Sequence, residues 1–127
     1  MGTNATIAIE LANDSVLAIY LHYDGYPSHA FETLRQHYSK NDIAYSLMAL
    51  GDMSVLGKHI APPEGEEGHS FDHPMKDVSI FYHRDKGEDE EATEARLYPS
   101  LKAMLNKEKR EYNYLFTKNG EWIQVGI

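Results

Sequence analysis

Two short phrases in this chain each place a histidine, an aspartate and a glycine at the end of an apolar run. The first occupies residues 20–25 (Tyr-Leu-His-Tyr-Asp-Gly) and the second residues 82–87 (Tyr-His-Arg-Asp-Lys-Gly). Each contains the pattern His-x-Asp, and side chains two residues apart on a strand point to the same face. An imidazole beside a carboxylate can ligate a metal, form an ion pair or contact a bound molecule. These phrases therefore contain the residues best suited to chemistry.

One hypothesis joins the two phrases in a metal site. If the strands that end at Tyr23 and Tyr82 are neighbours, two histidines and two aspartates meet at one edge of the sheet, where a divalent metal could activate water. The ligands would be His22, Asp24, His83 and Asp85. The protein would then be a metal-dependent hydrolase acting on a nucleotide. Two ligands per phrase are weak support, because histidine and aspartate at strand ends are common in turns and ion pairs. We therefore predict no metal or other cofactor, and a binding protein rather than an enzyme.

The stronger hypothesis is a recognition surface built from the same two phrases. Tyrosine rings with polar tips suit a surface that must both pack and form hydrogen bonds. Arg84 adds the positive charge that a bound phosphate requires. The glycine–proline break at residues 25–27 would leave the neighbouring rings at a rim rather than in the core. The residues predicted to contact a ligand or partner are Tyr20, His22, Asp24, Tyr26, His83, Arg84 and Asp85.

The composition limits what such a surface can bind. The chain has 127 residues, a formal net charge of −8 and no cysteine. The negative charge argues against generic nucleic-acid binding, which requires a cationic field. The lack of cysteine excludes disulfides, thiolate nucleophiles and cysteine-ligated zinc. No apolar run approaches the ~20 residues that span a bilayer, and the first residues do not resemble a signal peptide. We therefore predict a cytoplasmic protein without membrane contact.

Acidic residues gather in two segments. One is the run at residues 88–91 (Glu-Asp-Glu-Glu), and the other contains Glu64, Glu66 and Glu67. Runs of like charge usually form solvated surface. A further alternative is that these residues imitate the phosphates of a nucleic acid and so occupy a nucleic-acid-binding protein. The sequence leaves open whether either segment takes part in binding.

The elements that position the phrases follow from hydrophobic periodicity and turn residues. Apolar residues on either side of residues 13–15 (Asn-Asp-Ser) predict a hairpin, and residues 119–120 (Asn-Gly) predict a second one. Helical spacing of apolar residues that ends at Gly51 predicts two helices joined by a tight turn. Pro99 predicts the start of a third helix. Residues 61–76, rich in proline and glycine, predict a long loop.

The element order predicts the fold class. The predicted strands span residues 4–11, 16–23, 78–82, 112–116 and 122–125, with a short edge strand near 93–98, and the predicted helices span residues 28–38, 39–50 and 99–110. Without the edge strand the order is ββααβαββ. It predicts a single α+β domain over residues 1–127, with an antiparallel sheet of about five strands and helices packed on one face.

Several phrases of this chain, taken in order, resemble those of a group of small, mostly uncharacterised proteins encoded by bacteriophages and prophages. They are residues 19–27 (Ile-Tyr-Leu-His-Tyr-Asp-Gly-Tyr-Pro), 50–52 (Leu-Gly-Asp), 81–88 (Phe-Tyr-His-Arg-Asp-Lys-Gly-Glu), 111–116 (Glu-Tyr-Asn-Tyr-Leu-Phe) and 120–122 (Gly-Glu-Trp). The resemblance implies a phage or mobile-element origin and a setting in the host cytoplasm. It brings no established activity.

Small acidic proteins of that origin often act by binding a host component, including defence proteins and their nucleotide signals. By this analogy we predict a phage-type binding protein. It would inhibit a host component, above all a defence protein, by stoichiometric binding, or it would sequester a small nucleotide-like ligand. The sequence identifies neither the target nor the ligand, and both a monomer and a homo-oligomer are compatible with it.

Overall fold

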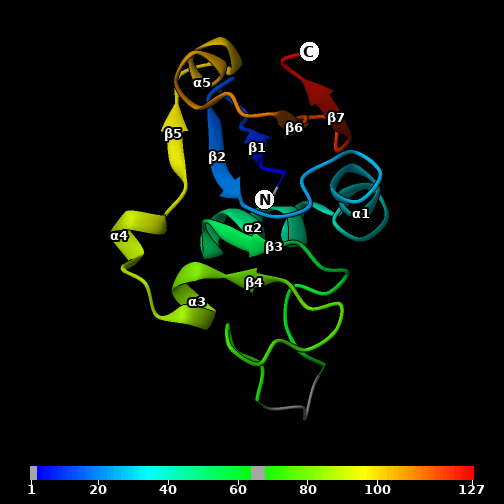
Figure 1. Cartoon of the computed structure of the whole chain (residues 1–127). Helices are drawn as coiled ribbons and strands as arrows, with labels where there is room; N and C mark the ends of the chain where they lie inside the picture. Colours follow the sequence, from blue (N-terminus) through cyan, green and yellow to red (C-terminus); the bar gives the residue numbers. More distant parts are fainter. Residues whose placement is uncertain (1–2, 64–67) are drawn as a thin grey trace.

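The strands of the computed structural model form one mixed sheet with helices on both of its faces (Figure 1). The structure describes residues 3–63 and 68–127. The strands are β1 (Ala5–Glu10), β2 (Val16–Leu21), β3 (Met53–Val55), β4 (Ile80–Phe81), β5 (Arg96–Tyr98), β6 (Tyr112–Phe116) and β7 (Trp122–Val125). The helices are α1 (Ala30–His37), α2 (Asn41–Leu50), α3 (Tyr82–Lys86), α4 (Glu90–Thr93) and α5 (Leu101–Glu108). The two predicted hairpins are confirmed as β1–β2 and β6–β7.

The sheet contains parallel as well as antiparallel pairs. Its strand order is β4-β3-β2-β1-β6-β7, and β5 pairs with the first half of β2. β1 runs parallel to β6, and β2 runs parallel to β3. The expectation of an antiparallel sheet of about five strands is therefore wrong. The reason is that helices act as crossovers between strands that run in the same direction. α1 and α2 lead from β2 to β3, and α5 leads from β5 to β6.

Helices cover both faces of the sheet because the central strands are apolar on both sides. Ile7 and Ile9 are buried in the larger cluster with α1 and α2. Ala8 and Ala18 lie on the opposite face and pack against Met104 of α5. Strands buried on both faces are nearly continuous apolar runs, as β1 and β2 are. The expectation that all helices pack on one face is therefore wrong.

The second histidine phrase lies in a short helix and not at a strand end. β4 consists of only two residues, and the helix α3 begins directly at Tyr82 and ends before Gly87. Residues 53–55, for which no strand is predicted from the sequence, form β3, which lies between β2 and β4. The two phrases are therefore not on neighbouring strands. In a helix the spacing His-x-Asp also fails to place both side chains on one face.

A long connection leaves the sheet between β3 and β4. Its described parts, residues 56–63 and 68–79, contain no regular element beyond a bridge between His59 and Val78. The predicted loop at 61–76 is therefore confirmed within the described residues. The acidic residues at 64, 66 and 67 lie outside the described residues. Over the part of the chain that the structure describes, no helix is long and apolar enough to cross a membrane.

Candidate binding surface

The end of β2 presents aromatic side chains on the sheet face that carries α5. Ile19 and Leu21 are buried in the core with α1 and α2, so the side chain of Tyr20 emerges on the opposite face. On that face α5 packs against Val16 and Ala18, which come earlier in the strand. Tyr20 is half-buried. The last part of β2 therefore carries an aromatic surface beyond the residues that α5 covers.

Three rings follow one another at this end of β2. The rings of Tyr20 and His22 meet edge to face with centroids 5.6 Å apart, and those of His22 and Tyr23 do so at 4.3 Å. The Tyr20 hydroxyl shares a hydrogen bond with Nδ1 of His22, and the Arg110 guanidinium lies 4.5 Å from the centre of the Tyr20 ring. Burial raises the pKa of Tyr20, so its hydroxyl is neutral at pH 7. Tyr23 is 43% exposed, so the group combines fixed rings with one that is open to a partner.

The start of α3 adds a second aromatic group beside the first. The Tyr82 N–H donates to the carbonyl of Asp52 (3.1 Å), and the Asp52 carboxylate accepts from the Tyr20 N–H (2.8 Å). The rings of Tyr82 and Phe71 lie 6.2 Å apart, and Nζ of Lys86 lies 4.7 Å from the Phe71 centroid. Burial raises the pKa of Tyr82, and the nearby Tyr20 adds to this shift. We call the combined group the tyrosine surface, which consists of Tyr20, His22, Tyr23, Phe71, Tyr82 and Lys86.

Three further predicted contact residues do not join this group. Asp24 is exposed in the turn after β2, with a left-handed backbone (φ 57°). Tyr26 is 39% exposed, and its ring lies 6.2 Å from that of His29, at the start of α1. His83 is exposed on α3, where its Nε2 lies 3.5 Å from the carboxylate of Glu90. Of the seven predicted contact residues, only Tyr20 and His22 therefore lie within the tyrosine surface.

Arg84 and Asp85 anchor the long loop to α3. Arg84 donates to the carbonyls of Ile60 (2.6 Å) and Ser79 (3.0 Å) and to both carboxylate oxygens of Asp85 (3.0 Å each). The Asp85 side chain is only 5% exposed and lies 3.6 Å from Nε2 of His69. His69 in turn hydrogen-bonds the Ser79 carbonyl (3.1 Å). The guanidinium predicted to face a bound phosphate is thus engaged by the protein itself.

The four side chains of the metal hypothesis are engaged separately. His22 is bound to Tyr20, whereas Asp85 accepts a hydrogen bond from the Phe81 N–H (2.8 Å). β3 separates β2, where the first phrase begins, from β4, which leads into the helix that carries the second phrase. Within residues 3–63 and 68–127, no three His, Cys, Asp or Glu side chains are grouped as a metal ion would require.

A network of four charged side chains lies behind the tyrosine surface. Arg96 contacts Asp52 (3.0 Å) and Glu108 (2.6 Å), and Arg110 also contacts Glu108 (2.6 Å). The carboxylates are largely buried, whereas the guanidinium groups are partly exposed. The network fixes Tyr20, because Asp52 binds its N–H and Arg110 lies against its ring. No sequence motif indicates this network, since its members come from three separate segments, around residues 52, 96 and 108–110.

The network predicts a loss of stability in acid. Burial raises the pKa of Glu108, but hydrogen bonds from Arg96, Arg110 and Tyr98 outweigh it and lower the pKa to about 2. Because this pKa lies below the unfolded value of 4.5, the stabilisation is complete above pH 4.5 and disappears as the pH falls to 2. We expect this group to contribute about 2 kcal/mol to the loss, after solvent screening of the arginines. Urea unfolding between pH 4.5 and pH 2 measures this loss of unfolding free energy. If the variant Glu108→Gln loses stability equally steeply over the same range, protonation of Glu108 is not its cause.

Comparison with protein-family models, with curated proteins and with solved structures finds no match to this chain. A function must therefore be inferred from the residues of the site itself.

Proposed function

We propose that this chain is a phage-type binding protein that inhibits a protein of the host cytoplasm by stoichiometric binding through the tyrosine surface. The supporting observation is the set of partly exposed aromatic rings at the end of β2, which α5 does not cover, and at the start of α3 beside it. Tyrosine is enriched at interface hot spots because it offers a large contact area and a hydrogen-bonding tip at low entropic cost. Several of these rings are already held by neighbours, so fewer side chains would have to be ordered on binding.

The charge of the chain favours a basic partner. The net charge is −8, and acidic side chains border the tyrosine surface. Glu88 donates its N–H to the Tyr82 carbonyl (3.0 Å), and its carboxylate lies 3.3 Å from Lys86. Two further acidic side chains, Asp24 directly after Tyr23 and Glu90 at the start of α4, are exposed to solvent. Complementary charge at the rim of an interface mainly increases the association rate and the specificity.

A protein partner is better supported than a nucleotide-like ligand at this surface. The donors of Arg84 are directed at Asp85 and at two backbone carbonyls. Lys86 lies over Phe71 and beside Glu88. A nucleotide would therefore find rings for stacking but would have to break existing contacts to reach a cation for its phosphate.

Capture from a host lysate followed by native mass spectrometry tests the proposal. The full chain serves as bait, together with the variants Tyr23→Ala and Tyr82→Ala. The control is Tyr45→Ala, because Tyr45 lies on α2 and is 42% exposed, almost as much as Tyr23. We expect a protein that binds one to one, and each surface variant to weaken that complex about thirtyfold, or about 2 kcal/mol.

Three outcomes would contradict this function. Tyr45→Ala could weaken the captured complex as much as the surface variants do. A nucleotide could be the only species released from the bait, which would favour sequestration of a small ligand. Finally, neutralising residues 88–91 could abolish capture while Tyr23→Ala and Tyr82→Ala leave it unchanged, which would favour nucleic-acid mimicry.

A further inference from the structure

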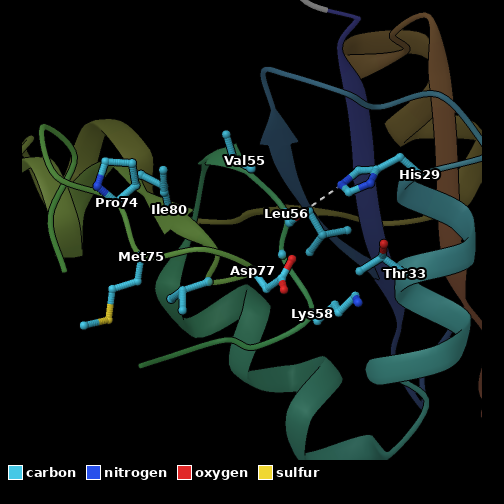
Figure 2. Close-up of a pocket in the computed structure, with 11 residues that line it drawn as sticks. His29, Thr33, Val55, Leu56, Lys58, Pro74, Met75, Asp77 and Ile80 are labelled. Atoms are coloured by element: carbon cyan, nitrogen blue, oxygen red, sulfur yellow. Dashed lines mark hydrogen bonds between the residues drawn. The ribbon is translucent and has the colours of Figure 1, made fainter. Parts of the chain in front are cut away.

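A cavity of about 340 Å³ lies between the start of α1 and two chain segments, residues 55–58 at the end of β3 and residues 74–80 at the start of β4 (Figure 2). It is separate from the tyrosine surface and shares no residue with it. Its size falls at the lower end of the range of about 300–1,000 Å³ that is typical of small-molecule sites. The cavity is therefore large enough for a small organic molecule.

Backbone contacts build the cavity wall. The His59 N–H donates to the Asp77 carbonyl (2.9 Å), and the Ser79 N–H donates to the His59 carbonyl (2.9 Å). Gly57 permits this close approach, since a Cβ there would lie 2.6 Å from the Asp77 carbonyl oxygen. Asp77 itself has a left-handed backbone (φ 63°), which aspartate tolerates better than most residues. The two segments are thus held together without a ligand, and they place Asp77 at the cavity.

The apolar part of the lining comes from both segments. Val55 ends β3 and Leu56 follows it, whereas Met75 lies in the chain that leads into β4 and Ile80 begins that strand. Figure 2 shows Met75 and Ile80 on one side of the cavity, with His29 and Thr33 of the α1 region on the other. These side chains offer an aliphatic and thioether wall that would favour an apolar group.

The polar part of the lining contains one cation and one anion. Lys58 and Asp77 are both exposed, and neither side chain forms an ion pair or a hydrogen bond within the described part of the chain. Nε2 of His29 is hydrogen-bonded to the Leu56 carbonyl (2.8 Å), which requires an N–H at this position. The Thr33 hydroxyl forms no hydrogen bond with the described residues, although Thr33 is 9% exposed. The lining thus offers one ammonium, one carboxylate and a free hydroxyl.

From this lining we infer that the cavity binds a small apolar zwitterion, namely a free aliphatic or aromatic α-amino acid. Lys58 pairs with its carboxylate and Asp77 with its ammonium group, while the side chain packs on Val55, Leu56 and Met75. A nucleotide phosphate fits less well, because it would bring two negative charges to a single lysine in a chain of net charge −8. A simple amine or a simple carboxylate would leave one of the two charges without a partner.

Calorimetric titration of the full chain with charge-deleted analogues tests this inference. The probes are L-leucine, 4-methylpentanoate, which lacks the ammonium group, 3-methylbutylamine, which lacks the carboxylate, and adenosine monophosphate. We expect leucine to bind, and both single-charge analogues to bind about tenfold more weakly or worse. The inference is wrong if leucine does not bind at millimolar concentration, or if any of the other three probes binds as tightly as leucine.

Two variants locate the binding at this cavity. Lys58→Met keeps the aliphatic stem, and Asp77→Asn keeps a residue that tolerates the left-handed backbone. Each should weaken leucine binding about tenfold, while Lys76→Met, an exposed lysine outside the lining, should leave it unchanged. Thermal unfolding of each variant confirms that it is folded. If Lys58→Met and Lys76→Met weaken leucine binding equally, leucine does not bind in this cavity. If Tyr23→Ala weakens it, the ligand lies at the tyrosine surface, which also overturns the inference.

Discussion

The variant Arg96→Met is expected to lower the free energy of unfolding by about 3 kcal/mol. Arg96 contacts both Asp52 (3.0 Å) and Glu108 (2.6 Å). Glu108 is almost fully buried and Asp52 largely so. Removing the guanidinium leaves Asp52 without a cation and Glu108 with only Arg110, and a buried carboxylate without a counter-charge is strongly unfavourable. The loss should therefore be large even though methionine retains most of the side-chain volume.

Arg35→Met is the matched control. Arg35 contacts Glu32 (3.2 Å) one helical turn away, and both side chains are about half exposed. Ion pairs in that setting contribute little, so we expect a change below about 0.5 kcal/mol. Urea unfolding can be followed by the fluorescence of Trp122, the only tryptophan of the chain, whose ring lies 5.0 Å from that of Phe116. Similar losses in the two variants would show that burial of the network contributes nothing to stability.

The hairpins could be predicted because their signals are local. Residues 13–15 and 119–120 carry turn-forming side chains between alternating apolar runs, and the structure has left-handed backbones at Asp14 (φ 70°) and Gly120 (φ 82°). Helices α1 and α2 were likewise marked by apolar spacing and by Gly51. Such features depend on a few adjacent residues, so one sequence is sufficient to identify them.

The sheet could not be predicted in the same way. Whether β6 joins β1 as a parallel or an antiparallel strand depends on the end of the sheet at which the chain enters β6 after α5, and no local residue specifies this. β3 and β4 have three and two residues, which is too short for alternation to be recognised. The second phrase had the apolar run of a strand, but Tyr82 starts a helix, and the predicted adjacency of the two phrases fails for this reason.

The candidate site was predictable only in part. The aromatic residues of the first phrase indicate a surface at the end of β2, and Tyr20 and His22 do lie there. The internal role of Arg84 could not be foreseen, because its partners Ile60 and Ser79 belong to a loop without regular structure. The charged network and the cavity likewise join residues far apart in sequence. Hydrophobic periodicity is read from residues that are close together in the sequence, so it cannot indicate contacts between side chains that are far apart in it.

The Leu-Gly-Asp phrase at residues 50–52 leads to the second large prediction. Gly51 has a left-handed backbone (φ 85°), and a Cβ on it would lie 2.3 Å from the Thr93 carbonyl oxygen. That carbonyl also accepts the Asp52 N–H (2.8 Å). Asp52 in turn binds the Tyr20 N–H and Arg96. The glycine therefore allows α4 to approach closely enough to fix Asp52, and so supports both the network and the tyrosine surface.

Gly51→Ala is accordingly expected to lower the free energy of unfolding by about 4 kcal/mol, from left-handed strain together with the clash at Thr93. Gly87→Ala is the control for a positive φ in open space, because Gly87 has the αL backbone (φ 80°, ψ 22°), unlike Gly51 (ψ −154°), and no atom lies within 4 Å of a Cβ built there. It should lose only about 1 kcal/mol. Urea unfolding of both variants compares the loss at Gly51, where strain and the clash act together, with the loss caused by αL strain alone at Gly87. If both lose the same amount, the contact between Gly51 and Thr93 does not constrain the fold, and Asp52 must be positioned by its ion pair with Arg96 alone.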